Sequence, residues 1–135
     1  MRIVLDTNVL VAGLLSPFGA PGQIVRLVSS GELALCLDAR IFSEYEEVLA
    51  RPKFGFDRDA TAALLDFVAH RGEMTAGSPL ACALPDPDDE PFLEVALASA
   101  ADYLVTGNHA HFPADRCEGC PLVSPAEFID AYRRR

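Results

Sequence analysis

The sequence predicts an α/β domain with a central parallel sheet, and three observations lead to this fold class. Short, continuous apolar segments alternate along the chain with segments of helical periodicity, which is typical of a sheet covered by helices on both faces. No dipeptide of the Asn-Gly type joins two apolar segments, so a tight hairpin is not indicated. A chain of 135 residues is long enough to bury a core, and we expect one domain over residues 1–135.

Four segments have the length and the apolar character of strands that are covered on both faces. They are residues 2–5, 33–37, 102–106 and a shorter one at 121–124. Cys36 lies within the second segment and is expected to be a buried thiol.

Five segments have helical periodicity, and several begin at a recognisable capping residue. Their ranges are 22–30, 39–50, 57–69, 89–100 and a last helix after Ser124. Asp38 is expected to cap the second helix and Asp57 the third. Ser124, Pro125 and Glu127 have the spacing of a capping box at the start of the last helix.

The formal net charge of −9 limits the partners that this chain can bind. An acidic protein repels the phosphate backbone, so unspecific electrostatic binding of nucleic acid is disfavoured. A nucleic acid can be a partner only if the acidic residues are concentrated at one place, where bound cations reverse the local potential. No apolar run reaches the about 18 residues that span a membrane, and no secretory signal is recognisable. We therefore expect a cytoplasmic protein that does not bind membranes.

Polar side chains stand where two of the expected strands end. Asp6 follows the first strand directly, and Thr106, Gly107 and Asn108 close the third. In open parallel sheets, binding sites form beyond the carboxyl ends of the strands. A carboxylate at the end of a covered strand is costly to bury unless it is paired, hydrogen-bonded or bound to a metal ion. Asp6 is therefore the first candidate for a functional residue.

The helix after the second strand offers a second acid. On a helical wheel Ile41 and Tyr45 define the inward arc, and Glu44 and Glu46 border this arc on either side. The wheel alone does not choose between the two glutamates. Glu44 is nearer in sequence to the strand end where Asp6 is expected, so we favour Glu44. The alternative is that it is simply a solvated residue at a helix border.

The sequence DPDDE carries four acids just before the fourth helical pattern. Asp89 falls on the inward arc of that helix, whereas Glu90 and Glu94 are expected to point away. Asp86 and Asp88 precede it in a proline-rich loop and could also reach a site. Acids at helix starts are most often N-caps, which is the alternative for each of these aspartates.

Carboxylates that meet at one end of a sheet repel one another. Two unit charges about 5 Å apart repel by roughly 3 kcal/mol at an effective dielectric constant of about 20. No Lys or Arg stands close in sequence to Asp6 or Asp89, although Arg40 or a more distant arginine could reach them. A divalent cation would relieve the repulsion, and oxygen ligands suit Mg²⁺ or Mn²⁺ better than Zn²⁺.

Three segments, taken in order, resemble the PIN-domain nucleases: IVLDTNVLVAGLLSPFGAP, IFSEYEEVLARPKF and DPDDEPFLEVALASAADYLVTGN. The resemblance extends through the closing LVSPAEFI, and it is closest to bacterial and archaeal toxins of toxin–antitoxin pairs, related to VapC-like toxins. It implies a three-layer α/β/α fold and a Mg²⁺- or Mn²⁺-dependent endoribonuclease that hydrolyses single-stranded RNA. It also implies a cognate antitoxin protein as partner, and a homodimer is a further expectation.

The resemblance assigns roles to individual acids. Asp6, Glu44 and Asp89 match the first three acids of the family, which bind the metal ion. Asp86 is the alternative for the third of them, because the run of acids leaves the register open.

Three further residues match polar positions of the family. Asn8 and Thr106 match positions that orient the acids or a phosphate. Asn108 stands where the family usually has a fourth acid, after Val-Thr-Gly, so weaker metal binding is expected. An alternative interpretation is a catalytically degenerate PIN fold that binds a protein partner, with Asn108 as a sign of the lost activity.

Another alternative is a Mg²⁺-dependent aspartyl phosphoryl-transfer domain, which also has an Asp at a strand end. A phosphatase of this kind requires a second Asp two residues later, where this chain has Asn8. A receiver domain requires a lysine at the end of a late strand, and Lys53 is not at such a position.

The segment HAHFPADRCEGC contains two histidines and a Cys-x-x-Cys pair, Cys117 and Cys120. Zinc binding and a redox pair are alternatives here, but the spacing matches no established zinc module. We expect ordinary residues of a surface loop.

Overall fold

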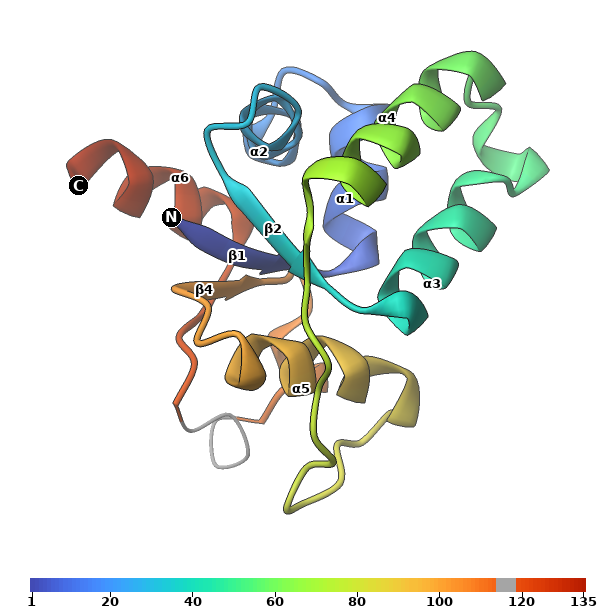
Figure 1. Cartoon of the computed structure of the whole chain (residues 1–135). Coiled ribbons are helices and arrows are strands. Elements are labelled where there is room, and N and C mark those ends of the chain that lie inside the picture. The colour runs from blue at the N-terminus through green and yellow to red at the C-terminus, as the bar shows by residue number, and fades with distance from the viewer. Residues whose placement is uncertain (114–118) are drawn as a thin grey trace.

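A parallel sheet forms the centre of the molecule (Figure 1). The computed structural model describes residues 1–113 and 119–135, and within these residues the sheet has five strands. The strands are β1 (Arg2–Leu5), β2 (Ala34–Leu37), β3 (Glu73–Met74), β4 (Tyr103–Val105) and β5 (Leu122–Val123). Their order is β3-β2-β1-β4-β5, and each neighbouring pair is parallel. The carboxyl ends of the strands therefore share one end of the sheet.

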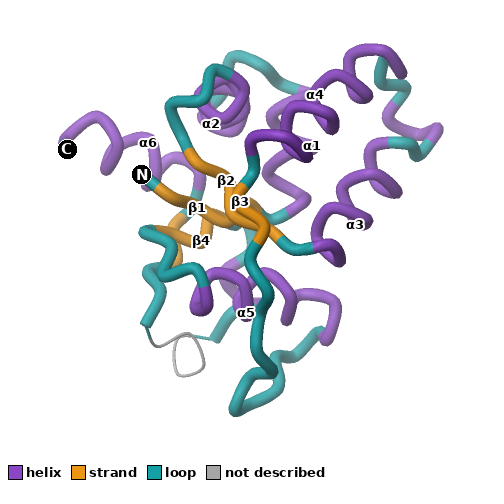
Figure 2. The backbone as a smooth tube through the Cα atoms, in the orientation of Figure 1, coloured by secondary structure: helices purple, strands orange, loops and turns teal. Residues whose placement is uncertain are grey.

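Helices cover both faces of this sheet (Figure 2). The α-helices are α1 (Thr7–Leu15), α2 (Ala20–Ser29), α3 (Ala39–Leu49), α4 (Arg58–Arg71), α5 (Glu90–Ala98) and α6 (Pro125–Arg134). Helix α5 contacts β1, β2 and β4 on one face, while α1, α2 and α4 lie on the opposite side of the sheet (Figure 1). Short 3₁₀ turns lie at η1 (Pro52–Phe54), η2 (Pro87–Asp89) and η3 (His109–His111). This three-layer α/β/α arrangement confirms the predicted fold class.

The four expected strands are confirmed, but two elements are not predicted by the sequence patterns. Helix α1 buries Val9, Leu10 and Val11 together, so it lacks the polar face that makes a helix visible in a sequence. Strand β3 consists of two exposed residues and therefore lacks the apolar pattern of a strand. In the described part of the chain, no single helix is long and apolar enough to cross a membrane. Helices α1 and α2 reach that length and composition only as a pair, which is bent by 101°.

The predicted helix caps are confirmed by hydrogen bonds. The Asp38 carboxylate accepts the backbone N–H of Ile41 at 3.0 Å and so begins α3. At α6, Ser124 Oγ accepts the N–H of Glu127 at 3.1 Å, and the Glu127 carboxylate accepts the N–H of Ser124 at 2.8 Å. Asp57 likewise caps α4.

One buried tyrosine connects the core with the carboxyl end of the sheet. Tyr45 in α3 has no exposed surface, and its hydroxyl donates a hydrogen bond of 2.5 Å to the carbonyl oxygen of Leu5. Leu5 is the last residue of β1. Helix α3 is therefore held beside the point where the chain leaves the sheet at Asp6. Cys36, in the adjacent strand β2, is a buried thiol as predicted.

Candidate functional site

Asp6 lies between β1 and α1 at the carboxyl end of the central strand. Its backbone N–H continues the sheet by donating to the carbonyl oxygen of Val105 at 3.0 Å. The residue is only 4% exposed, and its Oδ2 accepts a hydrogen bond of 2.7 Å from the Thr106 hydroxyl. Burial raises the pKa of Asp6, and the hydrogen bond from Thr106 opposes this shift without reversing it. Asp6 is thus a buried carboxylate that is costly to ionise.

Glu44 reaches the same region from α3, half-buried and on the helix face that adjoins Asp6. Its carboxylate accepts a hydrogen bond from the Thr7 hydroxyl in the first turn of α1. Burial raises the pKa of Glu44, the hydrogen bond from Thr7 lowers it, and the charge of Asp6 raises it further. The sequence argument favours Glu44 over Glu46, and the structure places Glu44 on the side of α3 that faces Asp6.

Asp89 is the last residue of η2 and precedes α5. Its side chain is 13% exposed, and its Oδ2 accepts no hydrogen bond among the described residues. The imidazole Nδ1 of His111 lies 3.0 Å from this oxygen, which is an ion pair only if the imidazole is protonated. Burial and then the charge of Asp6 raise the pKa of Asp89 to about 6, with Glu44 adding to the rise and His111 opposing it.

Asp86 has a different surrounding from Asp89. Its carboxylate accepts the backbone N–H of Asp88 at 2.9 Å and so caps the 3₁₀ turn η2. It influences the site from a distance, because its charge contributes to the raised pKa of Asp89. Between the two candidates for the third acid, the geometry favours Asp89.

The polar residues around the acids have distinct positions. Thr106 is fully buried, and besides bonding Asp6 its hydroxyl oxygen accepts the backbone N–H of Asn108 at 3.1 Å. The side-chain nitrogen of Asn108 lies 3.0 Å from Nε2 of His111. Asn8 is exposed in the first turn of α1. Thr106 therefore orients an acid, whereas Asn108 turns toward an imidazole.

Comparison with known proteins identifies the family. A family model described as PIN domain matches residues 2–110. The chain belongs to the PIN domain family. A solved structure described as VapBC2 from Rickettsia felis bound to a DNA fragment from their promoter contains a similar fold, with a TM-score of 0.58 and 16% sequence identity. The match covers 92% of this chain and 98% of that chain, and at this identity it is a likeness of fold.

No curated protein sequence matches this PIN domain. The acids predicted from sequence come together from three separate elements: Asp6 from the end of β1, Glu44 from α3 and Asp89 from the start of α5. The charge of Asp6 raises the pKa of Glu44, and the charges of Asp6 and Glu44 raise that of Asp89, so we treat the three as one group and call it the acidic cluster.

His111 belongs to this region of the PIN domain but was not predicted as a site residue. The sequence pattern places it beside His109 in a candidate zinc segment, whereas the structure places its imidazole against Asp89. The 3₁₀ turn η3 causes this placement, because it brings residue 111 back over the strand end at Asn108. Only the spacing of three residues from Asn108 could have indicated it.

The zinc and redox alternatives concern a segment that is only partly described. Cys117 lies outside the described residues, so its predicted role stays a prediction. Cys120 is buried beside β5, and its Sγ lies 3.8 Å from the carbonyl oxygen of Pro121. His109 lies 3.9 Å from the Glu127 carboxylate at the start of α6.

The donors of the acidic cluster fit a hard divalent cation. Carboxylate oxygens are the ligands that Mg²⁺ and Mn²⁺ prefer, and the buried Oδ2 of Asp89 accepts no hydrogen bond among the described residues, although His111 Nδ1 lies 3.0 Å from it. A nearby dication would also favour the ionised acids, whose pKa values burial raises. Among the described residues, no group of three or more His, Cys, Asp or Glu side chains is already arranged as a metal site.

Proposed function

We propose that this PIN domain is a divalent-metal-dependent endoribonuclease that hydrolyses single-stranded RNA. One observation carries the proposal: three buried or half-buried carboxylates, from Asp6, Glu44 and Asp89, converge at the carboxyl end of a parallel sheet. Like charges in a partly dry site destabilise the fold unless a cation compensates them. Such an arrangement is retained where it serves binding or catalysis.

In this proposal the residues of the site divide into metal ligands and groups that orient those ligands. Asp6, Glu44 and Asp89 would hold Mg²⁺ or Mn²⁺, with Asp86 as a more distant anionic neighbour. A bound cation would supply an activated water for attack on phosphorus and stabilise the charge on the leaving oxygen. The hydroxyls of Thr106 and Thr7 keep the carboxylates of Asp6 and Glu44 in a fixed orientation.

The acidic composition is compatible with an RNA substrate under this proposal. The net charge of −9 would repel a phosphate backbone over most of the surface. A cation held by the acidic cluster would reverse the potential locally, at the place where the scissile phosphate would lie. Exposed Asn8 and the Asn108 amide stand beside this place and could donate hydrogen bonds to phosphate or ribose.

Cleavage of a labelled single-stranded RNA by the purified protein tests the proposal. We expect cleavage with Mg²⁺ or Mn²⁺, none with EDTA, and products with a 5′-phosphate and a 3′-hydroxyl. Asp57→Asn is a matched control for Asp6→Asn, because it also neutralises an N-cap aspartate but does so at α4. A folded protein that binds the metal but leaves RNA intact would favour the degenerate, partner-binding PIN fold instead.

We also propose that the protein is the toxin of a toxin–antitoxin pair and acts in the cytoplasm. The likeness in fold to VapBC2 from Rickettsia felis supports this proposal. A small neighbouring gene with a DNA-binding pattern would encode the antitoxin. Expression of the PIN domain alone should arrest growth, and coexpression of that gene should relieve the arrest. Light scattering of the purified protein tests the expected homodimer.

A further inference from the structure

A buried glutamate in the middle of α5 has one arginine as its partner. Glu94 is 9% exposed, contrary to the expectation that it points to solvent. Its Oε1 accepts a hydrogen bond of 3.0 Å from Nη2 of Arg40, which lies in the first turn of α3. A carboxylate that is taken out of water requires such compensation. Arg40 therefore explains why an acid can stand on the inner side of α5.

The same guanidinium also binds the N-cap of its own helix. Nε of Arg40 donates to Oδ2 of Asp38 at 2.8 Å, and Nη2 lies 2.7 Å from that oxygen. The other oxygen of Asp38 accepts the N–H of Ile41 and begins α3. Arg40 thus joins the start of α3 to the middle of α5, and we call these contacts the Arg40 bridge.

The Arg40 bridge connects the two helices that supply acids to the site. Glu44 follows Arg40 by four residues in α3, so both side chains leave the same face of the helix. Asp89 stands at the start of α5, the helix that carries Glu94. Figure 1 shows the first turn of α3 beside α5 at the carboxyl end of the sheet.

A backbone segment covers the bridge and partly removes it from solvent. Gly77, in the segment after β3, lies so close that a Cβ atom there would stand 2.9 Å from Cβ of Glu94 and 3.4 Å from Nη2 of Arg40. The side chains of Asp38 and Glu94 are 13% and 10% exposed, respectively. Ion pairs with such shielded partners are much more sensitive to the loss of one member than pairs on an open surface.

We propose that Arg40 is a positioning residue, and that the Arg40 bridge sets the separation of Glu44 and Asp89 and thereby the metal affinity of the acidic cluster. This inference rests on the proposed function. Arg40 is half exposed and stands near the site, so direct binding of an RNA phosphate is the competing role. Its contacts with two carboxylates argue against that role, because they engage Nε and Nη2 of the guanidinium.

Arg40→Met removes the charged guanidinium and keeps an unbranched apolar side chain, and Arg51→Met is its matched control. Arg51 lies two residues after α3, is similarly exposed, and pairs at 3.0 Å with Glu47 of α3. Arg51→Met therefore removes an arginine ion pair that does not connect α3 to another helix. Titration calorimetry with Mn²⁺ should show binding weakened by about tenfold in Arg40→Met, as for other residues that orient metal ligands. Arg51→Met should bind Mn²⁺ as the wild type does.

A double variant separates positioning from simple charge compensation. In Arg40→Met/Glu94→Gln the buried charge and its partner are both gone, so thermal stability should return toward the wild-type value. Mn²⁺ affinity should stay low, because α3 and α5 are still not joined. If Mn²⁺ affinity returns together with stability, Arg40 only compensates a charge and the proposal is wrong. If Arg40→Met alone does not fold, the Mn²⁺ affinity of the double variant tests the proposal in its place.

RNA cleavage at saturating Mn²⁺ distinguishes the competing role. Under the proposal, kcat recovers at high Mn²⁺ while KM for RNA and its salt dependence stay those of the wild type. A raised KM with a smaller salt slope and unchanged Mn²⁺ affinity would show that Arg40 binds a phosphate, which overturns the inference. A wild-type protein that neither binds Mn²⁺ nor cleaves RNA would overturn the proposed function, and the inference with it.

Discussion

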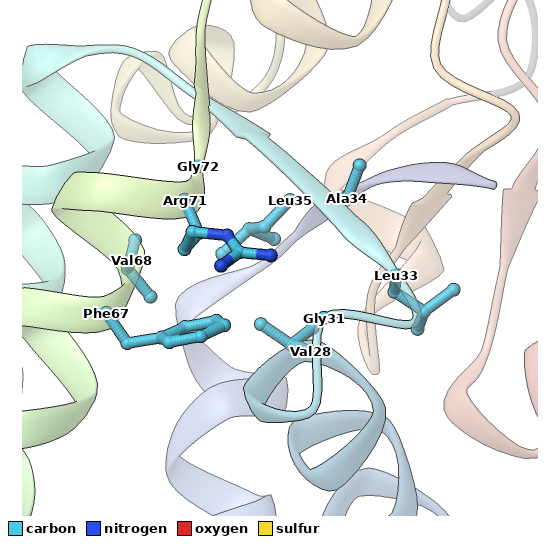
Figure 3. A pocket seen from close by; sticks show the side chains of 9 residues that line it. All are labelled: Val28, Gly31, Leu33, Ala34, Leu35, Phe67, Val68, Arg71 and Gly72. Atoms are coloured by element: carbon cyan, nitrogen blue, oxygen red, sulfur yellow. The ribbon is translucent and has the colours of Figure 1, made fainter.

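The two ends of the same parallel sheet have opposite chemistry. At the amino end of β2, a hollow of about 100 Å³ lies between α2, β2 and α4, and mostly apolar side chains line it (Figure 3). Its charged member, Arg71, lies over the ring of Phe67, with 5.8 Å from the guanidinium carbon to the ring centre. At the carboxyl end, burial raises the pKa values of Asp6, Glu44 and Asp89. The amino end therefore presents mostly apolar side chains, whereas the carboxyl end holds carboxylates whose ionised form is disfavoured by burial.

Asp6→Asn should have the largest effect on the rate of RNA cleavage and should not lower the stability of the fold. The variant loses a charged ligand but keeps the shape of the side chain and an oxygen that can accept from Thr106. We expect RNA cleavage to fall by about 1000-fold, the upper end for removal of one electrostatic group. The metal-free fold should be as stable as the wild type or more stable, because repulsion is relieved. Cleavage at the wild-type rate would remove Asp6 from the site.

Leu35→Ala tests the opposite end of the sheet. Leu35 is 3% exposed, lies in β2 and lines the hollow of Figure 3. Truncation of a buried leucine should lower the free energy of unfolding by about 3 kcal/mol, measured by urea denaturation. The Mg²⁺ requirement of the folded fraction should not change. A changed metal requirement would show that the two ends of the sheet are coupled.

Asp89→Asn should make the metal-free protein more stable near neutral pH. The pKa of Asp89 is raised in the fold, so its contribution to stability is complete below about pH 4 and is lost as the pH rises through about 6. A rise from 3.8 to about 6 corresponds to roughly 3 kcal/mol at most, and we expect about 2 kcal/mol because the charges of Asp6 and Glu44 are coupled to that of Asp89 and solvent screens part of the effect.

Urea denaturation in EDTA at pH 4, 5, 6 and 7 measures this effect. The wild type should lose stability over that range relative to the variant. Asp88→Asn is the control, because Asp88 is the adjacent acid but is exposed. Parallel curves for the wild type and Asp89→Asn would mean that Asp89 is better solvated than its surroundings indicate.

Asn108→Asp restores the acid that the family usually has at this position. Its effect on the Mg²⁺ requirement should be the smallest of those expected here. An added anionic oxygen beside the acidic cluster should lower the Mg²⁺ concentration for half-maximal cleavage by about tenfold, or about 1.4 kcal/mol. In the wild type the Asn108 amide faces His111, so part of the new charge will be neutralised if that imidazole is protonated. An unchanged Mg²⁺ requirement would place residue 108 outside the metal site.

Strands β1, β2, β4 and β5 and most helices are predictable because their patterns follow from burial on one or both faces, whereas the exposed residues of β3 carry no such pattern. Helix α1 is not predictable, since a helix that buries Val9, Leu10 and Val11 together resembles an extended apolar run. The wheel argument agrees with the 13% exposure of the Asp89 side chain, but it is wrong for buried Glu94 and for partly buried Glu90, whose carboxylate accepts the N–H of Leu84. A helical wheel assumes that a charged side chain turns to solvent, and Arg40 supplies an alternative that lies 54 residues away in the chain.

The positions of Asp6, Glu44 and Asp89 are predictable because strand ends and inward helix faces meet at one place in a parallel sheet. His111 is not predictable in this way. Its contact with Asp89 depends on a single 3₁₀ turn, whose path is set by local hydrogen bonds and not by an apolar pattern.

The hydrogen bond between Thr106 and Asp6 also has a consequence for the time at which the site forms. It spans 100 residues of sequence, and the second edge of β1 is paired only after β4 has joined the sheet. During synthesis from the amino end, at about 5–20 residues per second, Asp6 is made roughly 5–20 seconds before Thr106, because 100 residues separate the two. A ribosome-bound chain therefore carries the Asp6 carboxylate through this interval without the hydroxyl that orients it.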